Sequence, residues 1–164
     1  MSIYPAAIGI VFNEDKTQIL LVQRKDIPVW VLPGGGIDLH ETAEQAAIRE
    51  IKEETGFIVE IERKSGEYTP INRLAAFTTV FVCHIKGGNL LNASSESASV
   101  GFYSINALPK LFIEVHKQWL EDSLLNLDLV KKPITSITYT KLLIYFLRHP
   151  WHIIRYFYTR MFQS

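Results

Sequence analysis

The sequence predicts an α/β sandwich with a mixed sheet, followed by a C-terminal helical extension. Short apolar runs that end in polar or glycine-rich turns alternate with two segments of helical periodicity. The chain has 164 residues, of which 48% are hydrophobic and 21% are charged, and this composition is typical of a globular domain that buries a core. Strands wrapped around two helices give a layered α/β domain.

The strands are predicted first. Residues 6–12 form an apolar run that ends in an Asn-Glu-Asp-Lys turn, and residues 18–23 form a second run. A short strand over residues 30–32 leads into a proline and three glycines. Further strands are expected over residues 57–61, 67–68, 74–85 and 100–104, and a second helix is expected over residues 108–125.

The first helix has clear boundaries in the sequence. Thr42 is a favourable N-cap, and Gln45 three residues later completes a capping box. Gly56 stands where a glycine commonly ends a helix. A helix over residues 43–55 is therefore predicted.

Carboxylates crowd one face of this helix. Glu50, Glu53 and Glu54 are spaced i, i+3 and i+4, so they share a face on which like charges repel one another. Glu41 lies just before the first turn. Hard oxygen donors in such a group suit Mg²⁺ or Mn²⁺. The pattern favours a divalent-cation site, and the alternative is a solvated acidic helix after a glycine turn.

Residues 35–57 resemble the box of the Nudix hydrolases, G-x5-E-x7-R-E-U-x-E-E-x-G-U, in which U is a bulky apolar residue. Every fixed position matches, with Phe57 in place of an aliphatic residue at the last one. By order of elements the resemblance covers about residues 1–125. It implies a Nudix-type α/β/α sandwich over residues 1–128, and it leaves residues 129–164 outside the usual family domain.

The resemblance also implies the reaction, which is hydrolysis of a phosphoanhydride bond in a nucleoside diphosphate linked to a group X. Glu50, Glu53 and Glu54 are then the ligands of Mg²⁺, or of Mn²⁺, and the carbonyl of Gly34 is a further ligand. Glu53 is either a ligand or the general base. Arg49 is implied to pair with a box glutamate and to fix its orientation.

The remaining site residues are less specified. In relatives an acid from a distal loop acts as base or extra ligand, and here the loop over residues 93–99 holds only Glu96, whose alternative is an ordinary exposed glutamate. Glu41 is a secondary ligand or a structural contact, and Gly35 lets the backbone approach phosphates. Arg24 is a candidate phosphate contact or a surface residue. Tyr68 is a candidate for stacking on a base or a core aromatic.

Cysteine and charge restrict the setting. The single Cys83 excludes an internal disulfide and fits a reducing, cytoplasmic compartment. No signal-peptide pattern or membrane-spanning apolar run is expected. Residues 1–128 hold eleven basic and seventeen acidic side chains, a net charge of −6, so the body lacks the basic footprint of a nucleic-acid binder.

Residues 129–164 carry a net charge of +6 and are rich in aromatic residues. We expect helices divided by Pro150, with Trp151, Ile154 and Phe157 on one face. The favoured interpretation is packing on the chain's own domain or on a second subunit in a homodimer, and the alternative is peripheral contact with an anionic membrane. Two further functions stay open: a non-catalytic nucleotide-sensing module, and a membrane-recruited hydrolase of a lipid-linked diphosphate.

Overall fold

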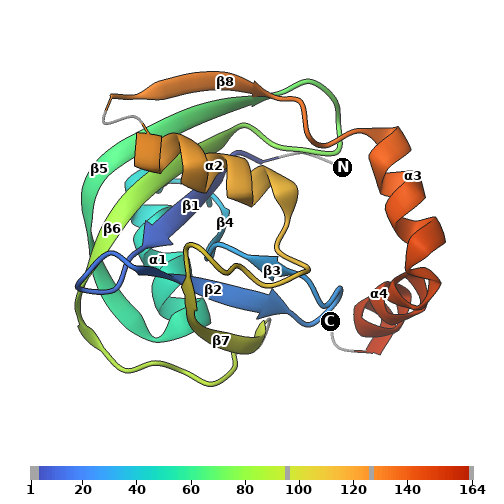
Figure 1. Ribbon diagram of the computed structural model, residues 1–164, viewed down its shortest axis with the longest axis horizontal. Coiled ribbons are helices and arrows are strands. Elements are labelled where there is room, and N and C mark those ends of the chain that lie inside the picture. The colour runs from blue at the N-terminus through green and yellow to red at the C-terminus, as the bar shows by residue number, and fades with distance from the viewer. Residues whose placement is uncertain (1–3, 95–96, 126–127, 163–164) are drawn as a thin grey trace.

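The structure is a computed structural model that describes residues 4–94, 97–125 and 128–162. Its strands form two sheets (Figure 1). In spatial order, the five-stranded sheet contains β4 (Gly34–Gly36), β1 (Ala6–Val11), β6 (Thr78–Gly88), β5 (Phe57–Pro70) and β8 (Val130–Ile134). The three-stranded sheet contains β3 (Trp30–Val31), β2 (Gln18–Arg24) and β7 (Ser97–Ser104).

The larger sheet is mixed. β1 pairs in parallel with β6 and antiparallel with β4, while β5 pairs antiparallel with β6 and in parallel with β8. Helices α1 (Ala43–Thr55) and α2 (Glu114–Leu125) pack around the strands (Figure 1). The predicted fold class, an α/β domain with a mixed sheet and C-terminal helices, is confirmed.

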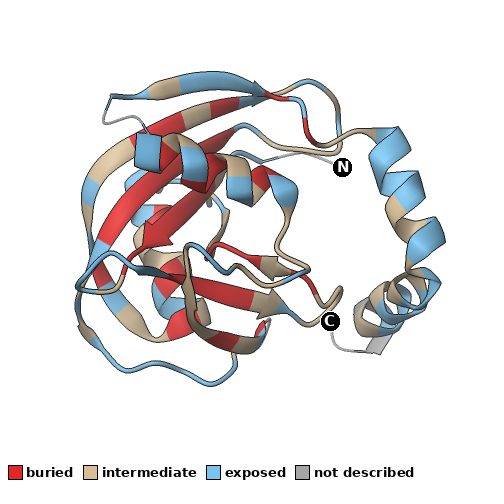
Figure 2. Cartoon of the chain, in the orientation of Figure 1, coloured by how far each residue is buried: buried red, intermediate tan, exposed pale blue. Residues whose placement is uncertain are grey.

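Two hydrophobic clusters form the core (Figure 2). The first includes Ala47 and Ile51 of α1 together with Phe81 of β6, and the second includes Trp119 of α2. The reason that α1 lies here is its sequence: the side that carries Ala46, Ala47 and Ile51 is wholly buried, which leaves the glutamates on another side.

The helix α1 begins and ends as expected. The Gln45 backbone N–H donates to Thr42 Oγ1 at 3.3 Å, and the Thr42 backbone N–H donates to Gln45 Oε1 at 2.8 Å. Gly56 has a φ of 81°, in the left-handed region that glycine adopts at little steric penalty. These caps fix where the acidic face of α1 starts and stops.

The structure differs from the expected elements in several places, among them the additional strand β4, a start of β6 at Thr78 and a start of β7 at Ser97. The strand β5 runs continuously through residues 64–66, where its register against β6 shifts. The helix α2 begins only at Glu114, because the segment before it pairs with β3: the Trp30 N–H donates to the Leu111 carbonyl, and the Ile113 N–H donates to the Trp30 carbonyl. Residues 130–134, expected in the helical extension, form β8, and Ile134 is buried in the core.

Helices α3 (Tyr139–Arg148) and α4 (Pro150–Phe162) follow β8 and lie at one end of the molecule (Figure 1). Thr138 caps α3, since its side chain accepts a hydrogen bond from the Lys141 N–H. Within the described residues, none of the helices is both long and apolar enough to cross a bilayer.

Candidate metal and phosphate site

A cavity of about 350 Å³ lies between the glycine strand β4 and the acidic face of α1. Most of the residues that the sequence singled out meet here. The cavity is lined by Arg24, Gly34, Gly35, Gly36, Arg49, Glu50, Glu53, Glu54 and Ser94. The helical spacing of the three glutamates and the position of β4 beside β1 therefore place carboxylates and a glycine backbone around one space.

Gly34 connects β4 to α1. Its N–H donates to Glu54 Oε2 at 2.9 Å, and its φ is +145°, which side-chain-bearing residues rarely adopt. A Cβ at this position would lie 2.3 Å from the Ala7 carbonyl oxygen of β1. Glycine is thus required both for the backbone conformation and for the close approach of β4 to β1.

Gly35 makes room for a carboxylate. A Cβ built on Gly35 would lie 2.6 Å from both Cδ and Oε1 of Glu50. Since such a contact is far inside van der Waals distance, any larger residue here would displace the Glu50 carboxylate. By contrast, a Cβ on Gly36 would meet no heavy atom within 4 Å.

Arg49 joins the loop before α1 to the helix. Its Nη2 donates to Glu41 Oε1 at 2.7 Å and to the Gly36 carbonyl at 3.1 Å, while its Nη1 lies 2.8 Å from Glu50 Oε1 and 3.5 Å from Glu53 Oε2. The hydrogen bond with Glu41, then the one with Glu50, raises the pKa of Arg49 above its ordinary value. Arg49 therefore stays positively charged and offsets the repulsion among the glutamates.

Glu41 stands at the edge of this group and does not line the cavity. Its Oε2 accepts from Arg49 Nε at 3.2 Å, and its Oε1 accepts from the Asp38 N–H at 2.7 Å. The hydrogen bond from Arg49, followed by that from the Asp38 N–H, lowers the pKa of Glu41. In the structure Glu41 fixes the loop before α1 through these contacts.

The residues of the cavity have the chemistry to hold a divalent cation. Glu50, Glu53 and Glu54 offer hard oxygen donors, and Gly34 and Gly35 add backbone without side chains to the same lining. Among the described residues, no group of three acidic, histidine or cysteine side chains already converges tightly enough to enclose a metal ion. In the structure the Glu50 carboxylate contacts Arg49, and the Glu54 carboxylate accepts from the Gly34 N–H.

The loops beside the cavity are tied together. Arg24 lies next to Asp26, with Nε at 2.9 Å and Nη2 at 2.5 Å from its carboxylate oxygens. Lys25 Nζ donates to the Ser94 carbonyl at 2.7 Å, so the loop after β2 holds Ser94 beside the cavity. The sequence did not indicate Ser94, which lines the cavity by its position in space.

A histidine supports the approach to the glycine strand. The Leu32 backbone N–H donates to His116 Nδ1 at 3.1 Å, and the His116 ring packs against Trp119 with ring centroids 4.6 Å apart. Burial, together with the charge of Arg24, lowers the pKa of His116 to about 3. The ring is therefore neutral at ordinary pH, which lets Nδ1 accept this hydrogen bond. No local sequence signal indicated this contact across 84 positions.

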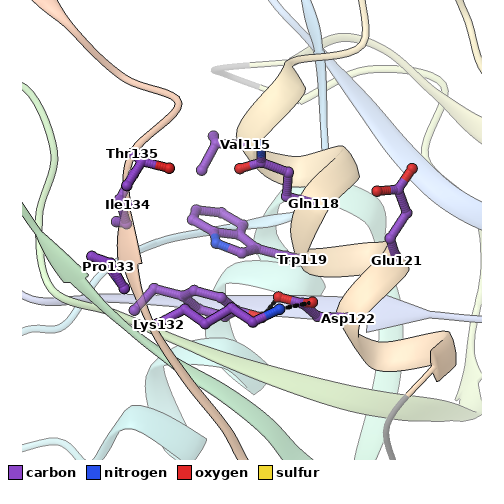
Figure 3. A pocket seen from close by; sticks show the side chains of 10 residues that line it. Val115, Gln118, Trp119, Glu121, Asp122, Lys132, Pro133, Ile134 and Thr135 are labelled. Carbon is purple, nitrogen blue, oxygen red and sulfur yellow. Dashed lines mark hydrogen bonds and ion pairs between the residues drawn. The ribbon is translucent and has the colours of Figure 1, made fainter.

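Tyr68 is not brought to this cavity. It is 3% exposed and lines a different cavity of about 310 Å³ between α2 and β8. Figure 3 shows Trp119 inside that second cavity, with Asp122 and Lys132 joined by an ion pair. The Tyr68 hydroxyl donates to Asp122 Oδ2 at 3.0 Å, and burial raises the pKa of Tyr68 well above its ordinary value. Its contacts in the structure are those of a core residue.

Glu96, the acid expected from the distal loop, lies outside the described residues. Its neighbours Ser94 and Ser97 are described, and the N–H of Ser97 donates to the Ser94 hydroxyl at 3.0 Å. Because Ser94 lines the cavity, the chain on the N-terminal side of this loop reaches the box carboxylates.

Comparison with known proteins agrees with this geometry. A family model described as the NUDIX domain matches residues 3–123. The chain is 40% identical over 116 residues to a Bacillus subtilis protein named "Putative 8-oxo-dGTP diphosphatase", covering 71% of this chain and 76% of that protein. It is 36% identical over 123 residues to an ADP-ribose pyrophosphatase of Methanocaldococcus jannaschii, covering 71% and 70%.

Solved structures resemble the fold as well. The crystal structure of an ADP-ribose pyrophosphatase from Streptococcus suis superposes with a TM-score of 0.65 at 26% identity. The match covers 80% of this chain and 99% of that one.

Proposed function

Because the chain belongs to the NUDIX domain family and is a Nudix hydrolase, we propose that it cleaves a phosphoanhydride bond in a nucleoside diphosphate linked to a group X, with Mg²⁺ as its cofactor. The observation that carries the proposal is the cavity in which Glu50, Glu53 and Glu54 face the backbone of Gly34 and Gly35. Carboxylates beside glycine backbone suit a divalent cation and the phosphates that the cation binds.

The roles follow from the contacts of each residue. Glu50, Glu53 and Glu54 would hold the ion, and the Gly34 carbonyl would be a further ligand. A bound divalent ion would neutralise phosphate charge and lower the pKa of the water that it binds. Glu54 already accepts from the Gly34 N–H, which positions it beside the glycine strand. Arg49 would keep Glu50 oriented toward the cavity, because it holds Glu50 Oε1 at 2.8 Å.

The substrate contacts would come from other residues that line the cavity. Arg24 brings a positive charge to its lining, which suits a phosphate oxygen. Gly35 would let a phosphate approach the backbone closely. The named relatives favour nucleotide substrates of two kinds, an oxidised deoxynucleoside triphosphate and ADP-ribose. Mn²⁺ would replace Mg²⁺ with the same ligands.

The general base is either Glu53 or Glu96. The Glu53 side chain is 61% exposed, and its carboxylate lies as far as 3.5 Å from Arg49 Nη1. It is therefore the box carboxylate that the protein holds least tightly. Replacing each in turn, Glu53→Gln and Glu96→Gln, and measuring kcat against pH separates them. Loss of the acidic limb of the profile in one variant identifies that residue as the base, since the limb reports its ionisation.

A cytoplasmic, reducing compartment would suit the enzyme, because its single cysteine forms no internal disulfide. Cys83 is a free cysteine that is 1% exposed, and burial raises its pKa to about 12. A thiol in that state is inert toward oxidation, and it contributes to the core rather than to the chemistry.

The experiment that tests the function is a substrate panel. Nucleoside triphosphates, oxidised dGTP, ADP-ribose, nucleotide sugars, diadenosine polyphosphates and an isoprenoid diphosphate are incubated with the protein in Mg²⁺, in Mn²⁺ and in EDTA, and the products are separated. We expect one class to be cleaved only with a divalent ion. Binding of ADP-ribose or a triphosphate without cleavage would overturn the proposal in favour of a nucleotide-sensing module. Cleavage only of an isoprenoid or other lipid-linked diphosphate would instead change the substrate class.

A further inference from the structure

The helices of the C-terminal extension expose an unusual amount of apolar surface. α3 has no buried residue, and Figure 2 shows α3 and α4 as exposed or intermediate along their described length. The exposed large side chains of α3 are Tyr139, Leu142, Leu143, Ile144 and Leu147. Scattered exposed apolar residues are normal, but a contiguous set on two successive helices marks a surface that contacts something else.

In α4 these side chains form one stripe. Trp151, Ile154, Phe157 and Met161 are spaced by three, three and four residues, so they lie on one face of the helix. Trp151 is 76% exposed and Met161 is 72% exposed. A helix that packs on a core turns its apolar face inward, whereas α4 turns its apolar face toward solvent.

The polar side of α4 is the side that is attached. Tyr145 of α3 packs against the core, and its hydroxyl lies 2.7 Å from His152 Nδ1 of α4. Arg155 Nε donates to the Lys25 carbonyl at 2.8 Å. These contacts link both helices to the domain through polar atoms and leave the apolar stripe directed outward.

The charge of the extension is of one sign. Asp128 is the last acidic residue of the chain. Lys131 pairs with Glu67 and Lys132 with Asp122, so the charges of β8 are offset by the domain. The helices carry four more Lys and Arg residues, at positions 141, 148, 155 and 160, and one histidine, while His149 stands between them. The apolar surface is therefore accompanied by positive charge without a single carboxylate on α3 or α4.

We propose that α3 and α4 bind the surface of an anionic lipid bilayer. A layer of negative headgroups offsets the basic side chains, and the aromatic and aliphatic stripe enters the boundary between headgroups and acyl chains. A second copy of this chain suits the surface less well. A two-fold interface brings the same patch of both copies together, so it would oppose two sets of positive charges with no acid between them.

The docked surface would adjoin the catalytic cavity. Lys25 accepts from Arg155 of α4 through its carbonyl and donates from Nζ to the carbonyl of Ser94, which lines that cavity. Two hydrogen bonds through Lys25 thus connect the membrane-bound helix α4 to Ser94 in the lining of the cavity.

The test is flotation of the full chain with vesicles of phosphatidylglycerol and phosphatidylcholine, compared with phosphatidylcholine alone, at low and high salt. Flotation separates bound protein from aggregates, which sink. The diagnostic variant combines Trp151→Glu and Phe157→Glu, both at exposed positions, so we expect the variant to fold. The matched control is Ile71→Glu, an exposed apolar residue outside the extension.

We expect binding to the anionic vesicles only, weakened by salt, and reduced about tenfold or more by the double substitution, since two aromatic side chains leave the bilayer. Arg148→Glu should reduce it by about fivefold or more. Failure of the chain to float, or equal flotation of the double variant, would overturn the proposal. So would a dimer in solution that the double substitution dissociates, because this assigns the surface to a second copy. Hydrolysis of a soluble substrate should be unchanged in the double variant.

Discussion

The backbone N–H of Leu32 donates a hydrogen bond to Nδ1 of His116, 3.1 Å away, and so ties the approach to the glycine strand to the helix α2. The contact exists only while the imidazole is neutral, because a protonated ring has no acceptor. The position of the strand that lines the cavity is therefore linked to the protonation of a residue that does not line it.

Replacing His116 tests this link through pH. The pKa of His116 is about 3 in the folded protein, below its ordinary 6.5, so between these values the unfolded chain binds a proton that the folded protein does not. The free energy of unfolding should fall by about 1.4 kcal/mol per pH unit as the pH drops through this window. Above pH 6.5 the imidazole is neutral in both states, so His116 adds no pH dependence there. His116→Asn keeps an acceptor and should flatten the slope in denaturant titrations. The exposed histidine variant His40→Asn is the control, and equal slopes in the His116 variant and the native protein would refute the assignment.

Gly35→Ala should damage activity more than stability. The added methyl would lie 2.6 Å from Glu50 Cδ, so the carboxylate must move away from its place in the cavity. A displacement of this kind lowers kcat/KM by about 100-fold in well-oriented sites. Gly36→Ala, with no atom within 4 Å of the new methyl, provides the control in the same strand. Comparable activity of the two variants would show that Glu50 does not need its observed position.

Glu54→Gln should separate metal binding from folding. The amide oxygen of glutamine still accepts from the Gly34 N–H, so the free energy of unfolding should change by less than about 1 kcal/mol. The loss of a charged ligand should lower kcat by at least about 100-fold and raise the Mg²⁺ concentration needed for half-maximal rate. Glu44→Gln, in the first turn of α1 and outside the cavity, should behave as the native enzyme. Normal turnover of the Glu54 variant would remove Glu54 from the site.

Tyr68→Phe should affect stability alone. The hydroxyl donates to Asp122 Oδ2 in the interior, and its loss should lower the free energy of unfolding by about 1 kcal/mol. Because Tyr68 lies in the cavity between α2 and β8, kcat and KM should stay at their native values. A raised KM would show that Tyr68 contacts substrate after all.

Local chemistry made much of this molecule predictable. The capping box of Thr42 and Gln45 located α1, and helical spacing alone placed Glu50, Glu53 and Glu54 on one face. The contacts of Ser94 and His116 had no such signal, since each depends on segments that are distant in sequence. The register shift in β5 just before Tyr68 is likewise a property of strand pairing, which alternation along one strand does not reveal.

The parallel pairing of β8 with β5 determines where the chain can be shortened. Without residues 130–134, the hydrogen-bonding groups of β5 over residues 66–70 would become an open sheet edge, and Ile134 would no longer cover the core. Open edges of this kind promote association between molecules. A shortened protein that ends before β8 should therefore aggregate for a reason unrelated to α3 and α4, whereas one that ends between β8 and α3 should stay free of aggregates and catalytically competent.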